Sequence, residues 1–170
     1  MKILIAADDK NILKSYKNIL ESRNHQVRTA EDGERCIQIY RQELGKLRNS
    51  EAISHPFYVV ILDYKMPKKD ELETVREIVE LVPDQKIIFV SFYTKIVRIS
   101  SAKKLKHAVE VLQKPFSMDV FIDKIEAREI VEQLETFGIH MSDLKYHLPS
   151  HKHLTKLLEE LLKIETKYFK

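Results

Sequence analysis

The sequence predicts a doubly wound α/β domain with a five-stranded parallel sheet, followed by a C-terminal helical extension. Two observations support this fold class. Short apolar runs of strand length alternate with longer segments of helical period, which is the pattern of βαβ units and a parallel sheet. Polar residues with carboxylate, hydroxyl or amino groups follow four of the apolar runs directly. In such sheets ligands bind beyond the carboxyl ends of the strands, so these residues are candidates for one shallow site.

The expected strands and helices follow one another in strict alternation. The runs of strand length are residues 2–7, 26–30, 58–62, 86–90 and 109–113. The second run alternates in polarity, which favours a place near an edge of the sheet. Apolar residues at helical spacing predict helices over 11–23, 70–82, 95–107 and 117–137, with one more after Gly33. We therefore expect residues 1–137 to form one domain.

Residues 138–170 are expected to form the helical extension. Gly138 can end the long helix before it, and Pro149 precedes a final helix whose leucines recur at spacings of three and four. The leucine stripe is too short to predict a coiled coil. It needs a partner surface, and the sequence leaves open whether that surface is the same chain, a second copy or another protein.

Composition limits the classes of protein. The chain has 170 residues, 44% of them apolar and 32% charged, as in a globular protein. It contains no apolar run long enough for a bilayer and no signal-peptide pattern. Cys36 is the single cysteine and excludes an internal disulfide; its surroundings predict a small buried helix residue. We expect a cytoplasmic protein that is not in a membrane. The net charge of +3 does not indicate nucleic acid.

The polar residues at the strand ends include carboxylates, a hydroxyl and a lysine. They are Asp8, Asp9, Asp63, Ser91 and Lys114. A carboxylate at the end of a buried strand is costly to hide. For Asp63 alone, an aspartate that caps a turn is an adequate explanation. The ordered set favours a reactive site instead.

Three carboxylates at one edge repel one another unless a cation is present, and hard oxygen ligands suit Mg²⁺. The ammonium of Lys114 and the hydroxyl of Ser91 add donors for phosphoryl oxygens. The nucleophile would then be a carboxylate, which forms an acyl phosphate.

In these residues the chain resembles the response-regulator receiver domains of two-component signalling. The resemblance covers about residues 1–135 and rests on four motifs in the order of the family. They are Asp8-Asp9, Asp63-x-x-Met66-Pro67, Ser91 and Lys114-Pro115-Phe116.

The resemblance implies a flavodoxin-like receiver in which Asp63 is the phosphoacceptor. It also implies that Mg²⁺ is held by Asp8, Asp9, Asp63 and the backbone carbonyl of Lys65, that Ser91 and Lys114 contact the phosphoryl group, and that the Lys114–Pro115 bond is cis. The implied partners are a sensor histidine kinase or phosphotransfer protein as donor and an unknown output protein, with a homodimer left open. Such a protein is a signalling phosphoacceptor and no enzyme, because it catalyses only its own phosphorylation and dephosphorylation.

The chain departs from the family at several positions. Val111 stands where receivers usually have an aromatic switch residue, Phe92 where they have a small residue, and Lys68 where they tend to have glycine. Lys65 and Tyr93 stand where receivers tune the access of the hydrolytic water, and their bulk predicts a persistent acyl phosphate. An alternative function follows: a receiver-like interaction scaffold with weakened or absent phosphorylation switching. A phosphatase of another α/β family is disfavoured. Such enzymes usually have a second aspartate two positions after the nucleophile, and this chain has Lys65 there.

Overall fold

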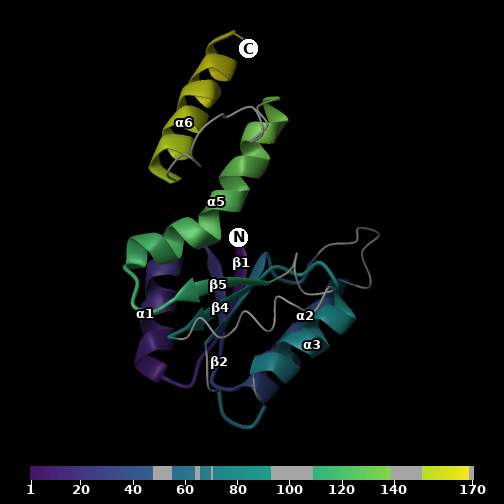
Figure 1. The fold of residues 1–170 in the computed structure, drawn as a ribbon. Coiled ribbons are helices and arrows are strands. Elements are labelled where there is room, and N and C mark those ends of the chain that lie inside the picture. The colour runs from purple at the N-terminus through teal and green to yellow at the C-terminus, as the bar shows by residue number, and fades with distance from the viewer. Residues whose placement is uncertain (48–54, 64–65, 70, 93–108, 139–150, 169–170) are drawn as a thin grey trace. The chain divides into compact units, whose positions relative to one another are not determined.

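The predicted five-stranded parallel sheet is confirmed (Figure 1). The computed structural model describes residues 1–47, 55–63, 66–69, 71–92, 109–138 and 151–168. Its strands lie in the order β2-β1-β3-β4-β5. Their bounds are Lys2–Ala6 for β1, Gln26–Ala30 for β2, Val59–Asp63 for β3, Ile87–Ser91 for β4 and Val109–Gln113 for β5. The chain runs from β1 outward to β2 and then returns to the other side of β1. The switch point of the topology therefore lies between β1 and β3, where such sheets form ligand sites.

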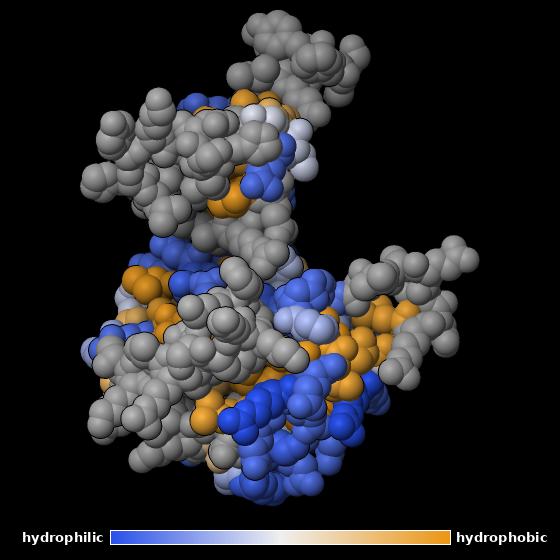
Figure 2. Space-filling model, turned by 45° about the vertical axis from the view of Figure 1, so that its right-hand side comes forward, coloured by the Kyte–Doolittle hydropathy of each residue, from blue (hydrophilic) through white to orange (hydrophobic). Residues whose placement is uncertain are grey.

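Helices cover both faces of this sheet. Figure 1 shows α1 (Lys10–Glu21) on one face, with α2 (Gly33–Leu47) and α3 (Glu71–Leu81) on the other. The outer sides of α2 and α3 are charged: Arg41 pairs with Glu77 at 2.7 Å, and Figure 2 shows hydrophilic side chains gathered on this side. The helix predicted over 95–107 lies outside the described residues.

Burial explains which strands are central. Every residue of β3 and β4 is buried, as expected for parallel strands with helices on both faces. Exposed and buried residues mix along β2 and β5, which confirms the edge position predicted for residues 26–30. Cys36 is fully buried in α2, and burial raises the pKa of its thiol to about 12. This confirms the prediction of a buried structural cysteine.

The two strands that carry Asp63 and Ser91 each end one residue later than predicted. The third strand was expected to end at Leu62 and the fourth at Val90, but β3 includes Asp63 and β4 includes Ser91. The reason is pairing: Asp63 is in register with Val90, and Ser91 with Gln113. Hydrogen bonds of the sheet thus fix the backbone of both polar residues.

The chain divides into two compact units, residues 1–116 and 117–170. The second unit contains α5 (Met118–Thr136) and α6 (His151–Tyr168). Leu158 of α6 packs with Ile130 and Leu134 of α5, and all three are at most 8% exposed. Part of the leucine stripe therefore has its partner surface in the same chain. The domain boundary after residue 137 stays a prediction. Among the described residues, none of the helices has the length and apolarity needed to cross a membrane.

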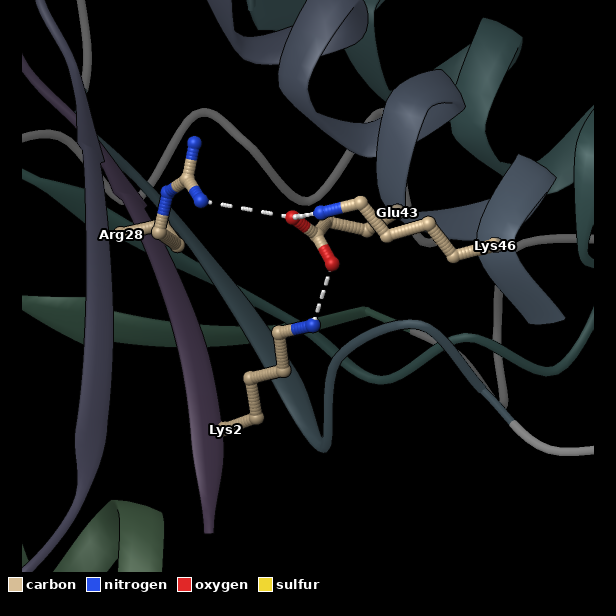
Figure 3. Close-up of polar contacts among 4 residues, drawn as sticks. All are labelled: Lys2, Arg28, Glu43 and Lys46. Carbon is tan, nitrogen blue, oxygen red and sulfur yellow. Dashed lines mark hydrogen bonds and ion pairs between the residues drawn. The ribbon is translucent and has the colours of Figure 1, made fainter.

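Glu43 of α2 is a buried carboxylate held by three cations (Figure 3). Its oxygens accept from Lys2 at 2.5 Å, from Lys46 at 2.9 Å and from Arg28 at 3.3 Å. These contacts tie α2 to β1 and β2. The hydrogen bond from Lys2, followed by that from Lys46, lowers the pKa of Glu43 from 4.5 to about 2.

We expect this cluster to make the fold sensitive to acid. Because the pKa of Glu43 is lowered in the folded state, its stabilisation is present above pH 4.5 and is lost as the pH falls toward 2. The loss should be about 1 to 2 kcal/mol, since partly exposed cations are screened by solvent. Urea unfolding at pH 7 and pH 3 measures it. The free-energy difference between wild type and Glu43→Gln should shrink at pH 3. Glu21→Gln, in an exposed pair with Lys17, is the control and should change little. An equal Glu43→Gln difference at both pH values would contradict the prediction.

Candidate functional site

Three of the predicted site residues meet at the carboxyl edge of the sheet. Asp63 ends β3, Ser91 ends β4 and Lys114 directly follows β5. The backbone N–H of Lys114 donates to the carbonyl of Ser91 at 2.8 Å. Because the three strands are adjacent and parallel, their last residues lie side by side. The sequence prediction that these residues converge is correct for this group.

Asp63 and Lys114 form a buried ion pair across the end of β4. The Nζ of Lys114 donates to Oδ1 of Asp63 at 2.9 Å and to Oδ2 at 2.7 Å. The exposed fraction of the side chain is 7% for Asp63 and 11% for Lys114. A carboxylate so far from water needs a charged partner. Lys114 supplies that partner to Asp63, whose carboxylate is the candidate nucleophile.

Ser91 is fully buried at the end of β4. Its place next to the Asp63–Lys114 pair is set by the strand register, which puts Ser91 one residue beyond the partner of Asp63. A hydroxyl group there can donate to an oxygen that develops negative charge. Its contact with the phosphoryl group stays a prediction.

The segment that carries Lys114 is anchored to α1. The Lys114–Pro115 peptide bond is cis, as expected. The ring of Phe116 stacks on Tyr16 of α1, with ring centroids 6.3 Å apart. Burial, and in second place the charge of Asp63, raises the pKa of Tyr16 to about 12. A neutral aromatic side chain from α1 thus fixes the end of the Lys114-Pro115-Phe116 motif.

The acidic pair Asp8-Asp9 lies at the switch point beside β3. Ala6 is in register with Leu62, so the residues after Ala6 leave the sheet next to Asp63. Both carboxylates are exposed. Asp9 also caps α1, since its Oδ1 accepts from the N–H groups of Asn11 at 2.7 Å and Ile12 at 3.2 Å.

This donor set fits a hard divalent cation by its chemistry, because it supplies carboxylate oxygens at an open edge. The described residues do not, however, gather three or more His, Cys, Asp or Glu side chains around one point. Both oxygens of Asp63 are bonded by Lys114 instead. Lys65 and Tyr93 lie outside the described residues. A metal would therefore have to share Asp63 with the lysine.

Two departures from the family pattern are visible at the site. Phe92 is 63% exposed, and its ring centroid lies 5.3 Å from the Nζ of Lys114. Val111, on β5, is 41% exposed. Its short side chain cannot make the large rotation of an aromatic ring, so an altered switch at this position stays a prediction.

The sequence did not reveal one ion pair beside the site. Asp32 is buried before α2, where its Oδ1 accepts from the N–H of Arg35 at 2.7 Å and its Oδ2 pairs with Lys68 at 2.6 Å. The hydrogen bond from Lys68, and then that from Arg35, lowers the pKa of Asp32. The capping role of Asp32 could have been predicted, because an aspartate just before a helix is a common N-cap. Its ion pair with Lys68 could not, because the two residues are far apart in the sequence.

Lys68 takes a backbone conformation that favours glycine, with a φ of 66°. The loop after Asp63 also approaches α2 closely: a Cβ on Gly33 would lie 2.4 Å from the carbonyl oxygen of Lys69. Position 33 therefore has no room for a larger side chain than that of glycine. The backbone of Lys68 is strained, because its φ lies in the left-handed region. The ion pair with Asp32 holds the strained residue in place.

A groove of about 570 Å³ lies near these residues, between α1 and the start of α2. Asp63, Ser91 and Lys114 do not line it. Its walls carry three lysines of α1 and three acidic residues at the start of α2, which are Lys10, Lys14, Lys17, Glu31, Asp32 and Glu34. We place the site at the Asp63–Lys114 pair, because the reactive groups meet there.

The fold and these residues define a doubly wound α/β domain with an acidic, lysine-bearing site at its switch point, which is the class of the receivers. Residues 3–126 match the family described as response regulator receiver domain. The chain belongs to this family.

Similar proteins agree. The response regulator receiver protein CpdR of Brucella abortus (strain 2308) is 26% identical over 125 residues, which is 74% of this chain and 93% of CpdR. A receiver domain from Clostridium thermocellum has a TM-score of 0.56 at 26% identity, covering 75% of this chain and 95% of that one. The response regulator TrrA of Thermotoga maritima, solved in complex with Mg(2+)-BeF, has a TM-score of 0.54 at 28% identity, covering 74% and 96%.

The strain at Lys68 can be tested by two substitutions. Lys68→Ala and Lys68→Gly both remove the ion pair with Asp32, but only glycine adopts a φ of 66° without a steric penalty. We expect the glycine variant to have the higher urea midpoint, by about 0.5 M. Lys14, an exposed residue of α1, is the matched control, where alanine should be the more stable of the two. A lower or equal midpoint for Lys68→Gly would show that the backbone is not strained.

Proposed function

We propose that Asp63 accepts a phosphoryl group from a phosphohistidine of a sensor histidine kinase or phosphotransfer protein. The observation that carries this proposal is the buried contact of Lys114 with both oxygens of Asp63. It brings a cation to the candidate nucleophile, at the place where phosphoryl oxygens would arrive. Membership of the receiver family supports the same assignment, since phosphoryl acceptance is the general function of these domains.

In the proposed reaction, a carboxylate oxygen of Asp63 forms a bond to phosphorus. The P–N bond to the donor histidine breaks, its electron pair stays on the imidazole nitrogen, and that ring is released. Lys114 then pairs with a phosphoryl oxygen and Ser91 donates its hydroxyl proton to another. Their places at the ends of adjacent strands support these roles.

Mg²⁺ is the proposed cofactor, with Asp8, Asp9, Asp63 and the carbonyl of Lys65 as its ligands. When bound, it would neutralise charge on the phosphoryl oxygens. Since Lys114 donates to both oxygens of Asp63, the metal would share one of these oxygens with the ammonium group. A relative in the family, TrrA, was solved in complex with Mg(2+)-BeF, which supports the choice of Mg²⁺.

The proposed output is altered association with another protein or with a second copy of the chain. Val111 favours a second candidate, a receiver-like scaffold whose binding does not depend on phosphorylation. Its short, 41% exposed side chain replaces the residue that usually reports the state of the site. In the first function, phosphorylation of Asp63 changes the association of the protein. In the scaffold function, Asp63 is either not phosphorylated or is phosphorylated without an effect on association.

We expect incubation with Mg²⁺ and acetyl phosphate to add one phosphoryl group to the protein, detected by intact mass. Asp63→Asn should lower the labelled fraction to background, because an amide is no nucleophile here. Chelation of the metal should slow labelling by at least tenfold, since the charge on phosphoryl oxygens is then poorly neutralised. An established receiver in the same donor solution is the control. If that receiver is labelled and this chain is not, the scaffold function replaces the proposed one.

The acyl phosphate should be persistent. Lys65 and Tyr93 are expected to hinder the hydrolytic water, so we predict that the combined change Lys65→Asn and Tyr93→Ala accelerates loss of the phosphoryl group several-fold. Loss of mass with time, after removal of the donor, measures the rate. The matched control carries Lys17→Asn, further along α1, and Tyr58→Ala, before the amino end of β3; its dephosphorylation rate should equal that of wild type. An unaltered dephosphorylation rate in the Lys65 and Tyr93 variant would exclude this role.

A further inference from the structure

Phe92 is an exposed aromatic residue whose ring lies over the lysine of the site. It follows Ser91 directly, it is 63% exposed, and its ring centroid is 5.3 Å from the Nζ of Lys114. The same ammonium group donates to both oxygens of Asp63, at 2.9 and 2.7 Å. The charge of Lys114 therefore has two partners, a carboxylate and an aromatic ring.

These two partners attract the ammonium in different ways. The attraction of the carboxylate depends on the charge of Asp63, whereas the attraction of the ring comes from its quadrupole and is fixed. When Asp63 gains a phosphoryl group, one of its oxygens becomes part of the acyl phosphate and the negative charge moves to the phosphoryl oxygens. The hydrogen bonds of Lys114 must then change. The contact with the ring of Phe92 can persist through this change.

We propose that Phe92 is a positioning residue that holds the ammonium of Lys114 at Asp63 before, during and after phosphoryl transfer. This inference rests on the proposed function. Phe92 acts through Lys114 and makes no bond to the phosphoryl group. An aromatic ring thus takes the position where the family has a small residue, and it limits the freedom of a long, flexible side chain. A side chain held in place loses less entropy when it binds the transition state.

A simpler role for the ring would be to obstruct the site, and substitutions separate the two roles. Phe92→Leu keeps an apolar side chain but shortens it and removes the quadrupole, so it would speed phosphorylation if the ring only obstructed the site. Phe92→Tyr keeps the aromatic face. Since Phe92 is 63% exposed, neither change opens a cavity in the core.

The first measurement is the rate of phosphorylation of the full chain by acetyl phosphate with Mg²⁺. We expect Phe92→Leu to be about two- to fivefold slower than wild type, which corresponds to an exposed cation–π contact. Phe92→Tyr should restore the wild-type rate. A Phe92→Leu rate equal to or higher than that of wild type would overturn the proposal, and so would a tyrosine variant as slow as the leucine variant.

The second measurement needs no phosphorylation. In protein with isotope-labelled lysine, the ε-methylene NMR signal of Lys114, assigned by its disappearance in Lys114→Arg, should show an upfield ring-current shift. Phe92→Leu should remove this shift and Phe92→Tyr should keep it. Lys2, whose Nζ lies 5.3 Å from the ring centroid of Phe57, is the internal control and should not move. A Lys114 signal unchanged in Phe92→Leu would overturn the contact. If wild type takes no phosphoryl group, the proposed function fails, while this result still decides whether Phe92 holds the lysine.

Discussion

The buried pair of Asp63 and Lys114 is the interaction on which the site depends. The two residues come from β3 and from the end of β5, which are separated in the sheet by β4. Their contact therefore closes the carboxyl edge over the last residue of β4, which is Ser91. Removal of one partner would break a buried ion pair, and such a change is destabilising. The sheet needs the pair as a structural contact, and the proposed chemistry would have to interrupt it.

This double role explains why the surroundings of the pair are so firmly held. The backbone of Lys114 is bound to Ser91, and Phe116 stacks on Tyr16 two residues further along. On the other side, the ion pair of Lys68 with Asp32 fixes the loop after Asp63 to the residue that precedes α2. The ion pair can thus exchange partners while the backbone that carries it stays in place. A preorganised backbone of this kind reduces the reorganisation that a reaction requires.

Much of the fold was predictable because it depends on repeating patterns. All five strands, and the helices predicted over 11–23, 70–82 and 117–137, lie within about two residues of their expected ends, since period and apolar content are read directly from the chain. The meeting of Asp63, Ser91 and Lys114 was also predictable, because parallel strands bring their carboxyl ends together. The positive φ of Lys68, its pair with Asp32 and the ring of Phe92 over Lys114 were not. These features depend on side-chain rotamers and on the close approach of distant loops, for which a single sequence contains no periodic signal.

The packing of α6 on α5 has a practical meaning for work with fragments of this chain. Ile130 and Leu134 are 8% and 0% exposed, and Leu158 of α6 packs with both. A fragment that ends with α5, at Thr136, would have the length of a typical receiver. It would also present these two side chains to water as part of an apolar surface, which favours self-association. Dimers of a shortened receiver could therefore arise from the cut itself, and only those formed by the full chain would bear on signalling.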